Sequence, residues 1–296
     1  MSMRGIELLM RSNRKPTLAD VALRAGVSAA TVSRFCKKPY MVSEEARTRV
    51  QQAIAELGYQ PSSSASPRSN DTSRNIGVVV PTLEIPTFAT GVSALHARLS
   101  ESEFMLQLAI SNFSPRQEIN CVRELIRSGV AGLVLVGTSH EPAVFEMLDR
   151  ARIPFVNIWD FIESDPRPCI GFDNRQAGRH IANYILSAGH REIAVMAGGG
   201  PQRSDRSVAR AEGTLSALRD AGIELPGNRI IELPYIMQAG AAAVRSFLEL
   251  KSPPTAIICT NDILAVGALL ESQRLGIRVP DELSFTGFDD LEISSL

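Results

Sequence analysis

Polar and aromatic side chains follow several predicted strands, at the points where those strands end. Trp159 and Asp160 come directly after one apolar run, Asn261 follows a second, and Asp289 follows a third, while Phe88 opens a helix after the first strand. The carboxyl ends of parallel strands meet at one edge of a sheet, where ligands bind. Aromatic faces suit the C–H surface of a sugar, and Asp or Asn groups pair with its hydroxyls. We therefore expect these five residues to line a binding cleft.

Arginines gather in residues 203–213, which follow the fifth predicted strand and enter a helix. A guanidinium beside a helix N-terminus can hold an anionic group through two hydrogen bonds. We expect Arg206 and Arg210 to belong to the cleft, with at least one facing an anion. On chemistry alone, a core position for Trp159, a capping role for Asp290 and a solvent-exposed Arg206 remain open.

Patterns for catalysis or metal binding are missing. The glycine run at 197–200 follows a strand, but the G-x-G-x-x-G spacing of a dinucleotide loop fails at Arg203. The four histidines have no neighbouring Cys or Ser that would complete a nucleophile–base pair, and the four cysteines form no C-x-x-C pair. We predict a protein that is not an enzyme and that has no cofactor, no metal and reduced thiols.

The residues after position 75 predict the elements that must position this cleft. Apolar runs alternate with helical segments, which is typical of βαβ architecture with parallel sheets. The runs form two groups of four around residues 165–168, so we expect two similar lobes, about 76–164 and about 165–296, with a cleft between them. The predicted strands are Ile76–Pro81, Phe104–Ile110, Gly132–Val136, Phe155–Ile158, Ile193–Ala197, Arg229–Glu232, Ala256–Cys259 and Leu283–Phe288.

Residues 16–59 predict a separate unit of three short helices with one small core. Each helix follows a hydroxyl residue that can cap its free amides, and Gly26 permits a tight turn between the first two. This layout is that of a helix-turn-helix, although a protein-interaction module could have a similar sequence pattern. The predicted helices are Leu18–Ala25 after Thr17, Ala29–Cys36 after Ser28 and Glu44–Leu57 after Ser43.

Charge is unevenly divided along the chain. Residues 1–74 contain 12 Lys and Arg against 6 Asp and Glu, whereas residues 75–296 contain 19 against 26. A basic segment on an acidic body suggests a polyanionic partner for the first part only. Residues 60–75 hold almost no large apolar group and two prolines, which predicts a linker. The leader carries no signal-peptide pattern, and no apolar run approaches the roughly 18 residues of a membrane span, so we expect a soluble, cytoplasmic protein.

The segment PTLADVALRAGVSAATVSRF over residues 16–35, together with LGYQP over residues 57–61, resembles the N-terminal signature of the LacI/GalR repressor family. The resemblance implies that the second helix enters the major groove of DNA. It also implies that Ala29 and Ala30 occupy two specificity positions and Arg34 a third. Alanine offers apolar contact, for instance to a thymine methyl group, and Arg34 can donate two hydrogen bonds to guanine.

The hydroxyl residues of the same segment have two possible roles. They can cap helices, or they can hold phosphates and so contribute to the DNA-binding surface. The residues concerned are Thr17, Ser28, Thr31 and Ser33.

The linker departs from the family pattern, in which an Asn and a hinge helix with a minor-groove leucine follow the position of Pro61. Ungapped alignment puts Ser62 at the Asn and Arg68 at the leucine. Pro67 lies inside the would-be helix, where it removes an amide donor. We therefore expect no ordinary hinge helix, and we expect Arg68 to reach a narrow minor groove electrostatically.

The resemblance also bears on the cleft. It implies that Arg210, Asn261 and Asp289 contact an effector, with Arg206 as an addition of our own. The segments GTSHEP at 137–142 and IPFVNIWD at 153–160 are similar to the gluconate-responsive branch of the family. A sugar acid is therefore the expected effector, and the arginines suit its carboxylate.

Together these patterns predict an α/β protein with an N-terminal helix-turn-helix domain at 16–59, a linker at 60–75 and a two-lobed, periplasmic-binding-protein-like domain at 76–296. The expected function is that of a homodimeric transcription repressor on a palindromic DNA operator, controlled by a sugar or sugar acid. The alternatives are a sugar receptor with impaired DNA binding and a sugar-modifying enzyme. Family members continue beyond the equivalent of Leu296 with a segment that helps close the lobes and form the dimer, so we expect either that this end is missing here or that the ending differs.

Overall fold

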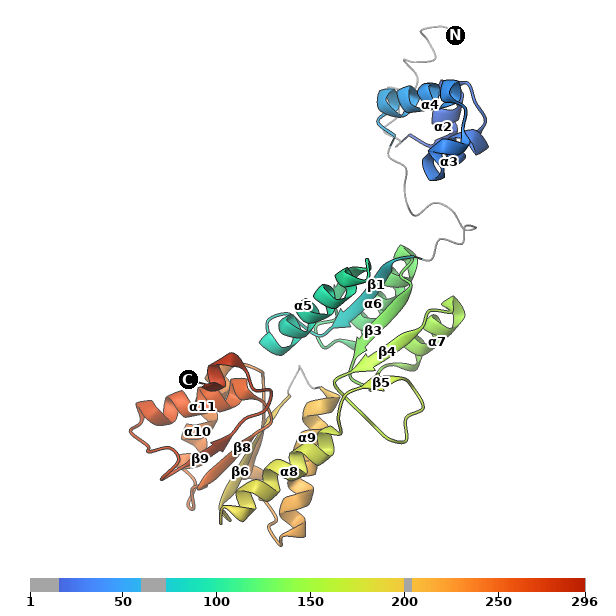
Figure 1. Cartoon of the computed structure of the whole chain (residues 1–296). Helices are drawn as coiled ribbons and strands as arrows, with labels where there is room; N and C mark the ends of the chain where they lie inside the picture. The colour runs from blue at the N-terminus through green and yellow to red at the C-terminus, as the bar shows by residue number, and fades with distance from the viewer. Residues whose placement is uncertain (1–15, 60–72, 200–203, 296) are drawn as a thin grey trace. The chain divides into compact units, whose positions relative to one another are not determined.

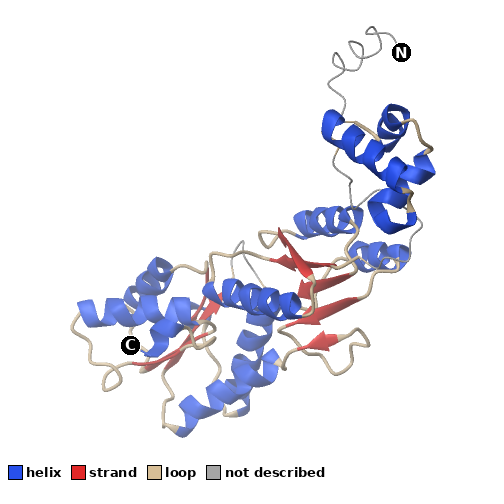
Figure 2. Ribbon diagram, turned by 45° about the horizontal axis from the view of Figure 1, so that its top comes forward, coloured by secondary structure: helices blue, strands red, loops and turns tan. Residues whose placement is uncertain are grey.

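A computed structural model describes residues 16–59, 73–199 and 204–295 of the chain (Figures 1 and 2). The chain forms two compact units, residues 1–70 and residues 71–296. Within the described residues, no helix combines the length and the apolar character needed to cross a membrane.

The first unit contains three α-helices and a short 3₁₀ turn around one small core. Its elements are α2 (Leu18–Ala25), α3 (Ala29–Lys37), η1 (Pro39–Met41) and α4 (Glu44–Leu57). Val21, Val32 and Val50 are fully buried and hold the three helices together. Gly26 ends α2 with a φ of 64°, the left-handed conformation that lets the chain turn at once into α3. The predicted helix-turn-helix is confirmed.

The second unit begins with a lobe built on one parallel sheet, lobe one. The strand order is β2-β1-β3-β4-β5. Successive side chains of a strand point to opposite faces of the sheet. Val78 and Val134 therefore pack against the helix layer on one face, and Val79 and Leu135 pack against the helix layer on the other. Helices therefore cover both faces of the sheet, as parallel strands require. The elements are β1 (Asn75–Val80), α5 (Pro86–Glu101), β2 (Met105–Ile110), α6 (Pro115–Ser128), β3 (Gly132–Val136), α7 (Pro142–Ala151), β4 (Phe155–Ile158) and β5 (Cys169–Ile170).

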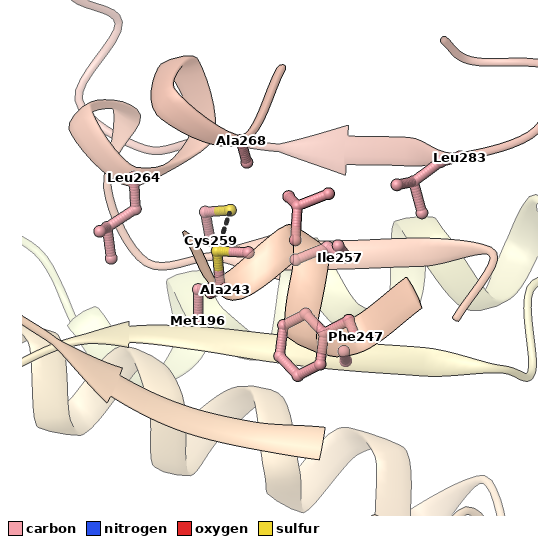
Figure 3. Close-up of a cluster of buried hydrophobic side chains, with 10 residues drawn as sticks. Met196, Ala243, Phe247, Ile257, Cys259, Leu264, Ala268 and Leu283 are labelled. Atoms are coloured by element: carbon pink, nitrogen blue, oxygen red, sulfur yellow. Dashed lines mark hydrogen bonds between the residues drawn. The ribbon is translucent and has the colours of Figure 1, made fainter. Parts of the chain in front are cut away.

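Lobe two repeats this design with the strand order β7-β6-β8-β9, again parallel. On one face of its sheet, Met196, Phe247 and Ile257 form a cluster with residues of α10 and α11 (Figure 3). On the other face, Val195 and Ile258 pack against α8 and α9. The elements are α8 (Asn174–Ser187), β6 (Ile193–Gly198), α9 (Asp205–Asp220), η3 (Gly227–Arg229), β7 (Ile230–Leu233), α10 (Met237–Leu248), β8 (Ala256–Cys259), α11 (Asp262–Arg274), β9 (Ser284–Thr286) and η4 (Glu292–Ser295).

The predicted βαβ architecture is confirmed, and two differences go beyond the one-residue shifts at the ends of β1, β2, β6 and β7. The first sheet has a fifth strand, β5, which pairs with β4 and lies beyond the lobe boundary expected near residue 164. Two residues are too short to give a periodic signal, which is why the sequence pattern misses this strand. The last strand is β9 at Ser284–Thr286, shorter than the expected Leu283–Phe288.

Reciprocal glycines bring the helices of lobe two unusually close together. A Cβ atom at Gly178 of α8 would lie 2.0 Å from the carbonyl oxygen of Arg210 in α9. A Cβ atom at Gly213 of α9 would lie 1.9 Å from the carbonyl oxygen of Arg175 in α8. Each helix therefore fits its backbone into the space left by a missing side chain on the other.

The helices on the opposite face of the sheet repeat this arrangement. A Cβ atom at Gly240 of α10 would lie 2.3 Å from the carbonyl oxygen of Leu264, and one at Gly267 of α11 would lie 2.0 Å from that of Met237. In all four contacts the carbonyl belongs to a residue three positions before the partner glycine. The two helix pairs are thus packed by the same device.

We predict that Gly178→Ala destabilises the second unit. The added methyl group would force α8 and α9 apart, and overpacking of this kind costs about 1–3 kcal/mol. This loss exceeds the gain of up to about 1 kcal/mol from higher helix propensity. Urea unfolding followed by the fluorescence of Trp159, the only tryptophan in the sequence, measures the change. Gly227→Ala is the control, because no atom lies within 4 Å of a Cβ there. Equal midpoints for both variants would contradict the prediction.

Candidate functional site

Two hydroxyl residues of the first unit cap its helices. Thr17 accepts a hydrogen bond from the Asp20 N–H, and the Asp20 carboxylate accepts from the backbone of Thr17 at 2.7 Å, which completes a capping box. Ser28 accepts from the N–H of Thr31 at 3.1 Å, and the two hydroxyls lie 2.9 Å apart. These side chains therefore stabilise the helix ends, and the surface position of Thr17 and Ser28 leaves them accessible as well.

The start of α3 presents the remaining predicted DNA-reading residues. Ala29, Ala30 and Arg34 are exposed, whereas Ser33 is half-buried. Arg34 has no ion-pair or hydrogen-bond partner among the described side chains, so its guanidinium is free for another acceptor. Arg68 lies outside the described residues.

The second unit contains a cleft of about 420 Å³ between its two lobes, and it gathers most of the predicted effector residues. Its walls are aromatic on both sides: Phe88 packs against Trp159 with ring centroids 5.4 Å apart, and Phe113 of lobe one stacks on Tyr235 of lobe two at 5.9 Å. The lining residues are Ile85, Thr87, Phe88, Phe113, Trp159, Phe172, Ser204, Arg206, Arg210, Tyr235, Asn261, Ile263, Phe288, Asp289 and Asp290.

Several polar atoms of the cleft have no partner within the described protein. Asn261 is 2% exposed, and its oxygen caps α11 through the Leu264 N–H, but its Nδ2 has no acceptor. Arg210 donates from Nε to the Thr260 carbonyl and from Nη1 to Asn174, which leaves Nη2 unpaired. Arg206 uses only Nη1, toward Asp205. The cleft therefore offers spare N–H donors to a ligand.

Asp289 supplies the complementary acceptor. It lines the cleft with a φ of 117°, a conformation that strains a non-glycine residue. Removal of its carboxyl group from water raises its pKa to about 6, against the lowering influence of Arg210, while Asp262 raises it and Arg206 lowers it. Its carboxyl oxygens can accept hydrogen bonds from hydroxyls.

Asp160 does not line this cleft but lines an adjoining cavity of about 870 Å³, which shares Phe113, Ser204 and Arg206 with the cleft. It is 5% exposed, and its two carboxylate oxygens accept from the Thr138 hydroxyl at 2.6 Å and from Nδ2 of Asn174 at 2.9 Å. Asn174 also donates to the Trp159 carbonyl at 3.1 Å. The structure therefore places Asp160 in a buried network that supports Trp159, where its oxygens are already occupied.

Several cleft residues were not anticipated from the sequence. Phe113 follows β2 and Tyr235 follows β7, so the strand-end rule that found Trp159 would have found them too. Phe172 and Phe288 pack together at 5.9 Å, and the guanidinium of Arg210 lies 4.1 Å above the Phe288 ring. No sequence signal marks this last contact, because it depends on how the helices of lobe two pack.

Comparison with known proteins bears on both units. Residues 17–62 match the family model described as bacterial regulatory proteins, lacI family. Residues 73–295 match the model described as periplasmic binding proteins and sugar binding domain of LacI family. This chain belongs to the LacI family. It is accordingly a DNA-binding transcriptional regulator with a sugar-binding domain.

Individual LacI-family relatives match over nearly the whole chain. The HTH-type transcriptional regulator GntR of Escherichia coli K12 is 33% identical over 287 residues, which cover 96% of this chain and 84% of the relative. A LacI-family regulator structure from Silicibacter pomeroyi is similar with a TM-score of 0.79 at 29% identity, over 94% of this chain and 83% of that one. The lac repressor dimer bound to operator and the anti-inducer ONPF gives a TM-score of 0.71 at 27% identity, over 95% and 84%. These relatives are transcription regulators.

We predict that Ser28→Ala loosens α3 of this LacI-family chain in the absence of DNA. Loss of an N-cap acceptor costs about 1 kcal/mol, which corresponds to roughly fivefold faster exchange of the α3 amides when opening is local. Hydrogen exchange of the full-length protein measures this. Ser43→Ala is the matched control, because Ser43 precedes α4 without a side-chain capping bond. If α3 exchanged at the same rate in both variants, the capping role would be wrong.

Proposed function

We propose that this regulator is a repressor whose affinity for its operator is set by a sugar acid bound in the interlobe cleft. The supply of unpaired polar atoms carries the proposal. Arg206, Arg210 and Asn261 have spare donors, and the first two are guanidinium groups that can pair with an anion. A ligand rich in acceptors matches this set, and a carboxylate forms charge-assisted bonds with guanidinium groups. The aromatic walls suit the C–H faces of a polyhydroxyl chain.

The helix-turn-helix is proposed to read the operator through the start of α3. Exposed Ala29 and Ala30 allow close apolar approach to base edges, and Arg34 has a free guanidinium for a bidentate contact with guanine. The hydroxyls of Thr17 and Ser28, which cap helices, are proposed to contact phosphates as well, together with those of Thr31 and Ser33. Arg68 keeps its proposed role at the minor groove.

The domain limits follow the same proposal: residues 16–59 bind DNA, residues 60–75 link, and residues 76–296 bind the effector. A homodimer on a palindromic operator is proposed in parallel with the lac repressor dimer bound to operator. Effector binding would then change operator affinity by thermodynamic linkage between the two sites.

The sugar-acid proposal is tested by a matched pair of ligands. D-gluconate and D-glucitol share the same chain of hydroxyls and differ in one carboxylate. We expect D-gluconate to bind at least about tenfold more tightly, because a hydrogen bond to a charged group is worth about 1.5–3 kcal/mol. Quenching of Trp159 fluorescence and titration calorimetry of the full-length protein measure both affinities. Equal or tighter binding of D-glucitol would overturn the choice of a sugar acid.

The operator-reading proposal is tested at Arg34. A duplex selected from a random pool by the full-length protein serves as operator. We expect Arg34→Ala to weaken operator binding by about 1–3 kcal/mol while binding to a scrambled duplex changes little. Arg24→Ala is the control, because that exposed arginine of α2 is paired with Glu56. Equal loss on both duplexes would show that Arg34 contacts phosphate and reads no base.

A further inference from the structure

Asp205, the first residue of α9 in lobe two, is hydrogen-bonded to the backbone of lobe one. Its Oδ2 atom accepts from the N–H of Thr138 at 2.8 Å and from the N–H of Ser139 at 3.0 Å. Its Oδ1 atom accepts from the backbone N–H of Arg206 at 2.9 Å and from Nη1 of Arg206 at 2.8 Å. One carboxylate therefore joins a loop of lobe one to a cleft arginine of lobe two; we call this arrangement the Asp205 bridge.

The loop of lobe one is shaped to receive this carboxylate. Gly137 has a φ of 89°, and a Cβ atom there would lie 2.5 Å from both Arg206 Nη1 and Asp205 Oδ2. Position 137 therefore needs glycine both for its backbone conformation and for the space. Behind the loop, His140 lies 3.1 Å from the Gly137 carbonyl and 2.9 Å from Glu118, and Thr138 is anchored to Asp160. These contacts hold the loop that carries the two amides.

The electrostatics favour the ionised form of Asp205. Burial by itself would raise its pKa, yet Arg206 and the N–H groups of Ser139, Thr138 and Arg206 together hold that pKa below its usual value. The side chain is 20% exposed, so these bonds are only partly screened by water. Charge-assisted hydrogen bonds of this kind are about twice as strong as neutral ones.

The bridge also orients Arg206 toward the ligand site. The guanidinium is 8% exposed and lies 5.9 Å from the Phe88 ring centroid, across the cleft from α9. Because Asp205 uses only Nη1, the other donors of Arg206 stay free. We propose that Asp205 is a positioning residue of the effector cleft, which fixes Arg206 for the ligand and ties the two lobes together at the same time. The effect of Asp205 on ligand binding rests on the function proposed above. The hydrogen bonds by which Asp205 ties the two lobes together do not depend on that function.

The tie is tested without any ligand, by amide hydrogen exchange of the full-length protein. We expect Asp205→Asn to speed exchange at Thr138 and Ser139 by about tenfold or more, since each amide loses a charged acceptor. We expect the exchange rates of the β3 amides, which are hydrogen-bonded within the sheet, to stay the same. The control is Asp149→Asn, the same chemical change at an exposed position of α7. Unchanged exchange at 138 and 139 in Asp205→Asn would overturn the proposal.

A second variant reaches the bridge from the other lobe. Gly137→Ala leaves the carboxylate intact but fills the space that it occupies. We expect the same faster exchange at Thr138 and Ser139, because the methyl group both displaces the carboxylate and strains the loop at a φ of 89°. Slow exchange in Gly137→Ala would show that the loop does not depend on the carboxylate and would overturn the tie.

The ligand arm uses D-gluconate as the probe. We expect Asp205→Asn to raise the Kd for D-gluconate by about tenfold through loss of an oriented charged donor, while Asp149→Asn leaves it unchanged. An unaltered Kd in Asp205→Asn would overturn the positioning of Arg206. If the unmodified protein does not bind D-gluconate, the sugar-acid proposal fails instead, and the exchange experiment alone decides the bridge.

Discussion

One buried amide side chain, that of Asn174, holds the two lobes in register. It is 1% exposed, it donates to Asp160 and to the Trp159 carbonyl, and its oxygen accepts from Arg210. A polar group buried this deeply must have its hydrogen bonds satisfied, since each one lost costs about 1–3 kcal/mol. The aromatic wall at Trp159 and the guanidinium of Arg210 therefore cannot shift independently. The relative position of these two parts of the cleft therefore depends on this residue at the start of α8.

Topology explains why much of the site could be predicted from the sequence. Parallel strands deliver their carboxyl ends to one edge, so recognising the strands is enough to locate Phe88, Trp159, Asn261 and Asp289. The helix-turn-helix can also be predicted from the sequence, because capping residues, Gly26 and a few apolar positions at helical spacing specify it locally. Strand ends and helix caps are determined by residues that are close together in the sequence.

The remaining features depend on contacts between distant segments. Asp160 stands at the expected strand end, yet the positive φ of Trp159 before it accompanies a turn of the chain, and Thr138 and Asn174 take up its oxygens. The donors that meet Asp205 are backbone amides, which every residue except proline carries, so no residue type marks them. Phe113 and Tyr235 meet only because two lobes come together.

The paired glycines of lobe two have a consequence for how motion passes through the protein. With backbone seated against backbone at Gly178 and Gly213, α8 and α9 have little freedom to slide, and α10 and α11 are joined in the same way. We therefore expect lobe two to move as a rigid body, with little change in how its helices pack against one another. The chain passes from lobe one to lobe two between β5 and α8, and we expect any rearrangement of the lobes on ligand binding to be concentrated there.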